Sequence, residues 1–500
     1  MGPTVQTTHG TLRGETSDGV SRFLGIPYAA SPTGSRRFKA PVPPALWTGV
    51  REATAYGPTP PKPDYPAPFD RLLAEPNIAG DDWLNLNVWT PDPAGSGLPV
   101  MVWIHGGAFA NGNSAIAMYD GHAFARDGVV LVGINYRLGI DGFALLPDAP
   151  ANRGLLDQIA ALEWVRDNIG AFGGDSGNVT VFGESAGAMS VTTLLSLPRA
   201  AGLFAKAIAE SGAVQAAATP QDAALITAEI GKALAAAGVT LSGGEVTAAS
   251  LAQVDLPDLI AAQAAVRDAL AGEPNPARFG ATIVAGSMPL VPVIDGDLMT
   301  AHPLAAIAAG AGSGVPLLIG TNAEEYRLFL VPSGVAATIN DGVLAAMGAR
   351  IGATSEVIET YRANRPGATP GDLAAALLTD RFFLQPAQAV AQARSAGPAA
   401  TYFYEFAWPR PVIGAAHALE IPFVFDNLRS PDADALLGGP APQDVASDMH
   451  AAWVRFAGTG DPGWPAYGDD RKVRMFRADG GTVVSDPRRD EREIWPQARP

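Results

Sequence analysis

Residues 183–187, Gly-Glu-Ser-Ala-Gly, combine a reactive hydroxyl with small neighbours. The β-branched and aromatic run at 179–182 predicts a buried strand, whereas residues 188–195 favour a helix. A sharp turn from strand to helix strains its central residue, and glycines on either side let the turn form without clashes. Since 56 of the 500 residues are glycine, the five letters alone are not specific, but their flanking segments are. The pattern predicts that Ser185 stands exposed above a sheet as a nucleophile.

A second glycine-rich segment could stabilise the negative charge that such a nucleophile creates. Residues 105–107, His-Gly-Gly, directly follow another predicted strand. The N–H groups of Gly106 and Gly107 can point into open space there, and with the N–H of Ala186 they would form an oxyanion hole. Alone, His-Gly-Gly is more often an ordinary turn, but its position ahead of the serine in the chain favours the oxyanion hole.

A serine hydroxyl is a weak nucleophile, so it needs a general base, and the base needs a carboxylate that orients it. Nucleophile elbows of this kind place the three groups in the chain order serine, acid, histidine. Among the six histidines, only His417 lies in a loop after the last predicted core strand, so we expect it to be the base. The other five are expected to be structural: His9, His105, His122, His302 and His450.

Two neighbouring glutamates could orient that base. The predicted strand at 317–319 runs into Gly-Thr-Asn-Ala-Glu-Glu, which ends in Glu324 and Glu325. Either carboxylate could face the carboxyl end of the sheet, where ligands of open α/β sheets bind. The spacing alone leaves both residues open.

Short runs of β-branched and aromatic residues alternate with helical stretches along the chain. The runs predicted as buried strands are 100–104, 129–135, 179–182, 207–209, 317–319 and 402–404. This alternation is typical of an α/β protein with a large central, mostly parallel sheet flanked by helices. Two alanine-rich stretches, about 220–270 and 342–399, are predicted as helical insertions that form a cap around the active-site gorge. With no long linker and no internal repeat, residues 1–500 are expected to be a single domain.

The composition excludes several classes of function. The chain is 47% hydrophobic and 17% charged, which is enough for a large core. With 50 acidic and 34 basic residues the net charge is −16, so neither nucleic acid nor an anionic membrane is expected as a partner. The absence of cysteine excludes disulfides, a cysteine nucleophile and thiolate metal sites. The first residues show no secretion signal and no apolar stretch suits membrane insertion, so we expect a cytoplasmic location, with a monomer slightly favoured.

Several longer segments resemble the type-B carboxylesterase family, which also contains the cholinesterases and bacterial para-nitrobenzyl esterases. Residues 172–187 are similar to the family's nucleophile signature from end to end. Further matches lie at 23–29, 84–88, 135–139 and 416–423, so the likeness spans nearly the whole chain. The resemblance implies the α/β-hydrolase fold and hydrolysis of small-molecule carboxylic esters, with no metal or cofactor.

The resemblance also implies roles for individual residues. The family's acid is the glutamate that closes a Gly-Thr-Asn-x-x-Glu segment, which falls on Glu325, and the base falls on His417. The oxyanion donors fall on Gly106, Gly107 and Ala186. Ser211 matches a second serine that, in relatives, supports the acid by hydrogen bonding.

One position departs from the family. Trp83 stands where many relatives have a cysteine that closes a disulfide. The loop is therefore expected to be held by packing, and the difference supports an intracellular form of the family.

The family implies uncharged substrates that acylate Ser185 and are then released by water. Apolar residues near the matched segments could form a wall for aryl or short-to-medium acyl groups: Phe109, Leu138, Phe143, Leu328 and Phe329. Carbamates or activated amides could be cleaved by the same three residues, and the sequence does not separate them from esters. A non-catalytic binding module, which relatives of this fold become after losing the serine, is disfavoured because Ser185, Glu325 and His417 are all present.

Overall fold

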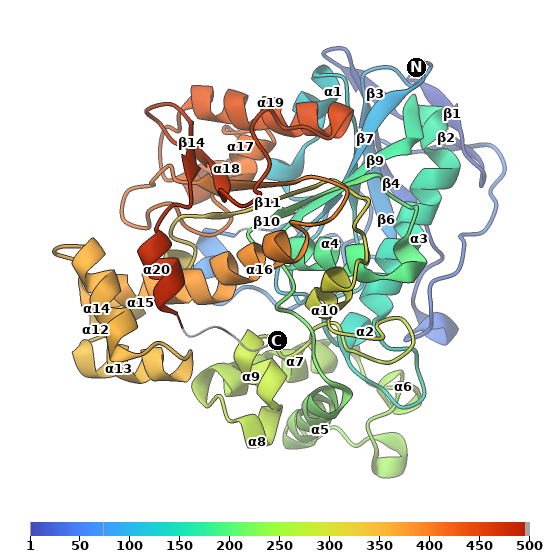
Figure 1. Cartoon of the computed structure of the whole chain (residues 1–500). Coiled ribbons are helices and arrows are strands. Elements are labelled where there is room, and N and C mark those ends of the chain that lie inside the picture. Colours follow the sequence, from blue (N-terminus) through green and yellow to red (C-terminus); the bar gives the residue numbers. More distant parts are fainter. Residues whose placement is uncertain (1, 74, 496–500) are drawn as a thin grey trace.

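The computed structural model describes residues 2–73 and 75–495, and within them an eleven-stranded sheet runs through the centre of the molecule (Figure 1). In spatial order its strands are β14 (Thr482–Ser485), β13 (Lys472–Phe476), β12 (Thr401–Phe406), β11 (Leu317–Asn322), β10 (Lys206–Glu210), β9 (Gly174–Glu184), β7 (Leu98–Ile104), β8 (Val130–Ile134), β6 (Asn85–Thr90), β4 (Val20–Pro27) and β3 (Glu15–Ser17). A three-stranded sheet contains β1 (Thr4–Gln6), β2 (Thr11–Arg13) and β5 (Val50–Glu52).

The central strands are parallel and the edges are antiparallel. From β13 through β12, β11, β10, β9 and β7 to β8, each strand runs parallel to its neighbour. The pairs β14–β13, β8–β6, β6–β4 and β4–β3 are antiparallel. The predicted α/β sheet is confirmed in mixed form, and each run predicted as a strand overlaps one of the central strands.

Helices and short turns connect the strands. Apart from the helices between β10 and β11 and between β11 and β12, the α-helices are α1 (His122–Arg126), α2 (Gly139–Phe143), α3 (Arg153–Asn168), α4 (Ala186–Ser196), α17 (Ile421–Val424), α18 (Pro431–Leu437), α19 (Gln443–Thr459) and α20 (Arg489–Ile494). The 3₁₀ turns are η1 (Gly34–Arg36), η2 (Phe69–Arg71), η3 (Ala117–Tyr119), η4 (Ile169–Phe172), η5 (Pro198–Ala200) and η6 (Ser242–Gly244).

Both stretches predicted as insertions hold helices. Between β10 and β11 the chain forms α5 (Pro220–Ala236), α6 (Ala248–Leu251), α7 (Leu256–Gly272), α8 (Pro276–Phe279), α9 (Ala281–Gly286) and α10 (Pro303–Ala308). Between β11 and β12 it forms α11 (Arg327–Leu330), α12 (Val335–Thr338), α13 (Asp341–Arg350), α14 (Ser355–Asn364), α15 (Pro370–Thr379), a π-helix (Asp380–Leu384) and α16 (Gln385–Ala393). Side chains of Thr219, Thr354 and Thr369 cap α5, α14 and α15, which explains where these helices begin. In the view of Figure 1 both insertions lie below the sheet, whereas α19 lies above it.

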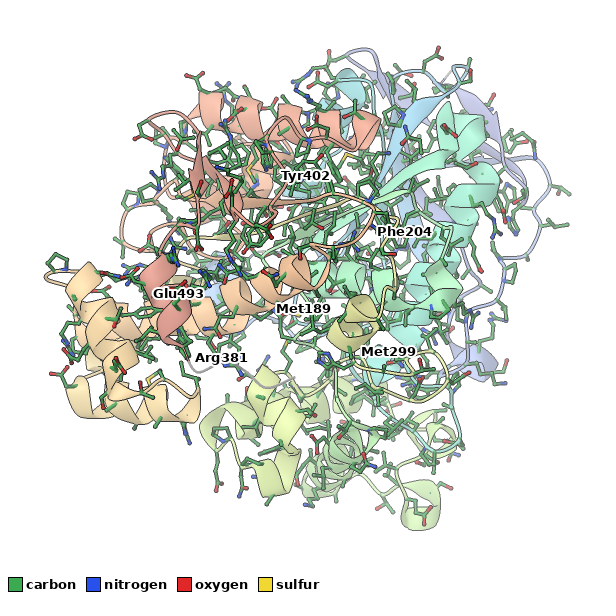
Figure 2. The ribbon with its side chains drawn as sticks, viewed as in Figure 1. Met189, Phe204, Met299, Arg381, Tyr402 and Glu493 are labelled. Atoms are coloured by element: carbon green, nitrogen blue, oxygen red, sulfur yellow. The ribbon has the colours of Figure 1, made fainter. Side chains whose placement is uncertain are left out.

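Alternation of side chains along the strands explains the two helical layers. On β7, Val100, Val102 and Ile104 belong to the core cluster that contains residues of α3, α4 and α16. Met101 and Trp103 on the same strand belong to the cluster that contains residues of α1, α17 and α19. Side chains fill the space between the sheet and both layers (Figure 2). The central strands are therefore apolar on both faces, which is why they read as continuous hydrophobic runs.

No helix in the described ranges has the length and apolar composition that crossing a bilayer requires.

Candidate active site

Ser185 lies at the tight turn between β9 and α4. Its backbone angles are φ 56° and ψ −122°, outside the regions that non-glycine residues normally adopt. The turn brings backbone so close that a Cβ on Gly187 would lie 1.9 Å from the carbonyl oxygen of Ile104, and one on Gly183 would lie 2.5 Å from the same atom. The N–H of Ser185 donates to the Glu210 carbonyl at 2.9 Å, which ties the turn to β10. Ser185 can adopt this strained conformation because Gly183 and Gly187 have no side chains that would clash with β7.

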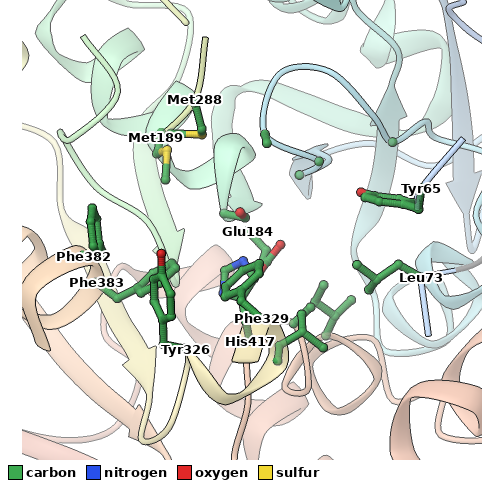
Figure 3. A pocket seen from close by; sticks show the side chains of 18 of the residues that line it. Tyr65, Leu73, Glu184, Met189, Met288, Tyr326, Phe329, Phe382, Phe383 and His417 are labelled. Atoms are coloured by element: carbon green, nitrogen blue, oxygen red, sulfur yellow. The ribbon is translucent and has the colours of Figure 1, made fainter. Parts of the chain in front are cut away.

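A cavity of about 300 Å³ opens above this elbow (Figure 3). Its walls are mainly apolar, with side chains from Tyr65, Leu73, Ile116, Met118, Tyr119, Met189, Met288, Tyr326, Leu328, Phe329, Phe382, Phe383, Ile421 and Leu436. Its polar side chains, apart from the tyrosines, are Glu184, Ser185, Gln215, Ser287 and His417. Figure 3 shows Phe382 and Phe383 on one side of His417, and Tyr65 and Leu73 on the other. A mainly apolar cavity with a few convergent polar groups is the usual form of a small-molecule site.

The predicted apolar wall is only partly correct. Leu328 and Phe329 line the cavity as expected. Phe109, Leu138 and Phe143 instead belong to the buried core, where the rings of Phe109 and Phe143 pack edge to face at 4.9 Å. Proximity in sequence to the matched segments did not reveal which way these side chains point. The π-helix supplies Phe382 and Phe383, which the sequence analysis missed.

His417 faces a buried carboxylate in the loop after β11. Its Nδ1 lies 2.6 Å from Oε2 of Glu325, which is fully buried, and the N–H of Asn322 donates to Oε1 of the same carboxylate at 2.8 Å. Glu324 instead points away: its side chain is 42% exposed and pairs with Arg327. The structure therefore brings Glu325, and not Glu324, to the histidine.

The other ring nitrogen of His417 lies beside a second carboxylate. Nε2 is 3.1 Å from Oε1 of Glu184, the residue that precedes Ser185. Among the described residues no hydrogen bond joins Nε2 to the Ser185 hydroxyl, although both side chains line the same cavity. Catalytic hydrogen bonds of free enzymes are often long and shorten when substrate binds. Glu184 was missed as a site residue, and its signal was a carboxylate directly adjacent to the nucleophile.

Burial and charge shift the pKa values of both groups. Burial raises the pKa of Glu184 well above its usual range. Burial also acts to lower the pKa of His417, but the carboxylates of Glu184 and Glu325 outweigh this and raise it to about 9. A proton on Glu184 removes the charge that favours imidazolium, so the two groups compete for the same proton and titrate together.

The predicted oxyanion donors meet at the elbow. Gly106 and Gly107 line the cavity, and their N–H groups have no acceptor among the described residues. Ala186 begins α4, so its N–H is one of those that a helix leaves unpaired. Ala108, which the sequence analysis missed, also lines the cavity, with φ 54° and an equally unpaired N–H in the described chain. The arrangement offers several donors beside the serine.

Ser211 contacts a different carboxylate from the one that the resemblance implies. Its hydroxyl donates to Oε1 of Glu420 at 2.9 Å, and the other oxygen of Glu420 accepts from the side chain of Asn322. Burial and the charge of Glu325 raise the pKa of Glu420 to about 7. Ser211 therefore reaches Glu325 only indirectly, through Glu420 and Asn322, because the first carboxylate on its path is Glu420.

The remaining histidines lie outside the cavity. His105 stacks on Tyr136 with its Nδ1 2.8 Å from the Gly106 carbonyl, and burial lowers its pKa to about 3. His450 contacts the Val424 carbonyl, and His302 caps α10. Within the described residues no group of three or more His, Asp or Glu side chains is placed to hold a metal ion.

Trp83 is buried, and its Nε1 donates to the Gly80 carbonyl at 2.6 Å. The burial of Trp83 agrees with the expectation that packing holds the loop before β6. Hydrogen bonds also hold this loop, since Glu75 accepts from Asn111 and Gly112.

Comparison with known proteins assigns the chain to a family. The model of the carboxylesterase family matches residues 1–485. The para-nitrobenzyl esterase of Bacillus subtilis is 38% identical over 98% of this chain and 97% of its own, and the phenmedipham hydrolase of Pseudarthrobacter oxydans is 34% identical over 97% of each. A carboxylesterase structure from Geobacillus stearothermophilus superposes with a TM-score of 0.84 at 38% identity, over 99% of this chain and 100% of that one. With a serine elbow, a buried His–Glu pair and this likeness along its length, the chain belongs to the carboxylesterase family and is a carboxylic ester hydrolase of the α/β-hydrolase fold.

Proposed function

We propose that the protein hydrolyses uncharged esters with aryl or short-to-medium acyl groups through an acyl-enzyme on Ser185. The observation that carries this proposal is the contact between His417 and buried Glu325 at the rim of the cavity into which the strained elbow places Ser185. Glu325, His417 and Ser185 then act as acid, base and nucleophile.

In the first half-reaction, Nε2 of His417 takes the proton from Ser185 as the hydroxyl oxygen attacks the ester carbonyl carbon. Glu325 accepts from Nδ1–H, which leaves Nε2 as the basic nitrogen and stabilises the imidazolium that forms. The N–H groups of Gly106, Gly107 and Ala186, together with that of Ala108, stabilise the negative carbonyl oxygen of the tetrahedral intermediate.

The first half-reaction ends with loss of the alcohol. The imidazolium of His417 gives its proton to the departing alkoxide, so the alcohol leaves and the acyl group stays on Ser185. In the second half-reaction a water molecule loses a proton to His417 as it attacks the acyl carbonyl. The imidazolium then returns that proton to the Ser185 oxygen as the bond from this oxygen to the acyl carbon breaks, which releases the acid and restores the free enzyme.

The lining of the cavity supports uncharged substrates. Its residues include no lysine or arginine, so an anionic acyl group would find no permanently cationic side chain there. The net charge of −16 adds a weak long-range repulsion of anionic esters. Cytoplasmic location and a monomeric state remain predictions, which cell fractionation and sedimentation would test.

Substitution of the nucleophile tests the assignment. We expect Ser185→Ala to lower kcat for para-nitrophenyl butyrate by more than about 10⁴-fold, because the hydroxyl is the attacking atom. An organophosphate ester should label Ser185 in the original protein, as seen by peptide mapping, and should leave the variant unlabelled. Full activity in Ser185→Ala would refute the mechanism.

The carbamate and amide alternative is tested with matched substrates. Ester, carbamate and anilide analogues that share one acyl or aryl group should be cleaved with the ester fastest, since poorer leaving groups demand better proton delivery from His417. A higher kcat/KM for the carbamate would assign the protein to carbamate hydrolysis instead.

A further inference from the structure

The carboxylate of Glu75 connects the segment before β6 to the loop that carries Gly106 and Gly107. Its Oε2 accepts from the N–H of Gly112 at 2.7 Å, and its Oε1 accepts from Asn111 Nδ2 at 3.1 Å. The Glu75 side chain is only 9% exposed. The contact therefore joins two segments that are far apart in the sequence and shielded from water.

Lys62 supplies the opposite charge. Its Nζ lies 3.6 Å from Oε2 of Glu75, its side chain is 3% exposed, and it has no hydrogen-bond acceptor among the described residues. Burial raises the pKa of Glu75 and lowers that of Lys62, so the two charges depend on each other. Removing either partner would leave an uncompensated buried charge.

The backbone that Glu75 holds packs directly against the glycine loop. At Gly112 φ is +92°, and a Cβ there would lie 2.4 Å from the carbonyl oxygen of Gly106. At Gly107 φ is +108°, and a Cβ there would lie 2.2 Å from the carbonyl oxygen of Asn111. These two backbone segments are packed against each other without a gap. We therefore expect a shift of Gly112 to move the N–H groups of Gly106 and Gly107.

The same segment forms part of the cavity wall. Tyr65 and Leu73, which lie between Lys62 and Glu75 in the sequence, line one side of the cavity (Figure 3). Asn111 Nδ2 also donates to the carbonyl of Pro63 at 2.6 Å. The wall and the glycine loop are therefore held by one polar network.

We propose that Glu75 is a positioning residue for the oxyanion hole, and that Lys62 cancels a negative charge that would otherwise oppose the oxyanion. This inference rests on the proposed function, because it assumes that Gly106 and Gly107 donate to the substrate oxygen. Negative charge develops on that oxygen only in the transition state. Misaligned donors therefore lower kcat and leave ground-state binding unchanged.

Two variants separate this role from folding stability. Glu75→Gln should lower kcat for para-nitrophenyl butyrate by about tenfold or more while KM stays within about twofold, since losing one oxyanion donor outright costs more than this. Glu75→Gln also leaves Lys62 as an unpaired buried charge, so its urea midpoint should fall. The double variant Lys62→Met/Glu75→Gln removes that charge, so its urea midpoint should return towards that of the original protein while its kcat stays low. Asp70→Asn, an exposed carboxylate on the same segment, is the control and should change neither quantity.

Two ketones report on the oxyanion directly. A trifluoromethyl ketone adds the serine hydroxyl to form an oxyanion, whereas the matching methyl ketone binds mainly as the intact carbonyl. Affinity for the trifluoromethyl ketone should fall in Glu75→Gln by the same factor as kcat, with affinity for the methyl ketone unchanged. Equal losses for both ketones, or a double variant with both normal stability and normal kcat, would overturn the proposal.

The proposed function fails by a separate result. If Ser185→Ala retains activity, the serine mechanism is wrong, whatever Glu75→Gln does. If Ser185→Ala is inactive but Glu75→Gln keeps its kcat and its affinity for the trifluoromethyl ketone, only the positioning role is wrong.

Discussion

Two carboxylates contact the imidazole of His417, one at each ring nitrogen. Glu325 Oε2 lies 2.6 Å from Nδ1, and Glu184 Oε1 lies 3.1 Å from Nε2. Negative charge on either residue stabilises the imidazolium, which cannot act as a base. Glu325 orients the ring, so Glu184 is the position where a charge can be removed while the orientation is kept.

Glu184→Gln should therefore move the acid limb of the pH profile to lower pH. Burial acts to lower the pKa of His417, but neighbouring carboxylates raise it to about 9, and the charge of Glu184 is the first among them. Activity requires neutral His417 and rises as pH increases through its pKa, so a lower pKa gives activity at lower pH. The measurement is kcat/KM for an uncharged ester over a pH series. Glu324→Gln removes a half-exposed charge nearby as a control, and an acid limb that does not move in Glu184→Gln would contradict this expectation.

Some residue assignments could be made from the sequence and others could not. His417 was found by elimination among few histidines, whereas Glu324 and Glu325 differ only in how the turn after β11 directs their side chains. That turn is fixed by the Asn322 N–H, which donates to Glu325. The sequence did not predict the free N–H of Ala108 or the hydrogen bond from Ser211 to Glu420. The first depends on the backbone angles of a loop and the second on the approach of a distant segment, and neither leaves a local sequence pattern.

At the scale of elements, the elbow depends on the close approach of β9, α4 and β7. A Cβ at Gly187 would lie 1.9 Å from the Ile104 carbonyl oxygen, which is backbone and cannot rotate away. The first turn of α4 and the end of β7 would have to separate, and they carry Ala186 and the glycine loop. Strain at this point would therefore reach both the nucleophile and the donors.

Gly187→Ala should destabilise the protein by about 3 kcal/mol and lower kcat as well, because overpacking of this kind forces backbone shifts. Gly458→Ala, in the last turn of α19, is the control: nothing lies within 4 Å of its added Cβ, so we expect neither destabilisation nor a loss of kcat. Urea unfolding and steady-state kinetics of both variants give the comparison. A Gly187→Ala protein as stable as the parent would show that the elbow can relax.

The central strands could be predicted because they are buried on both faces and so consist of apolar runs. The outer strands were missed because their sequences are not continuous apolar runs. β13 alternates polar and apolar residues over a short length, and β6 contains buried asparagines at Asn85 and Asn87. Short, half-exposed or polar strands are recognised only once their neighbours in the sheet are known.

At the scale of the whole molecule, one sheet incorporates residues from both ends of the described chain. β3 begins at Glu15 and β14 ends at Ser485, and both are edges of the eleven-stranded sheet. The central strands between these edges are buried, so none of them can leave the sheet without exposing the apolar faces of its neighbours. That residues 1–500 form a single domain stays a prediction.

A single domain should unfold in one step. We expect coincident transitions when urea unfolding is followed by tryptophan fluorescence and by far-ultraviolet circular dichroism. Two separated transitions would instead divide the chain into units that unfold independently, with the helical insertions as the first candidates.

The cavity walls come from segments as distant as Tyr65 and Leu436. Such a site has no local nucleus, since its loops are brought together only after the long-range strand pairs have formed. During refolding from urea, ester hydrolysis should therefore return later than the circular dichroism signal of the helices. The recovery of activity then measures the rate of the last step of assembly. Activity that returned together with the first helical signal would contradict this order.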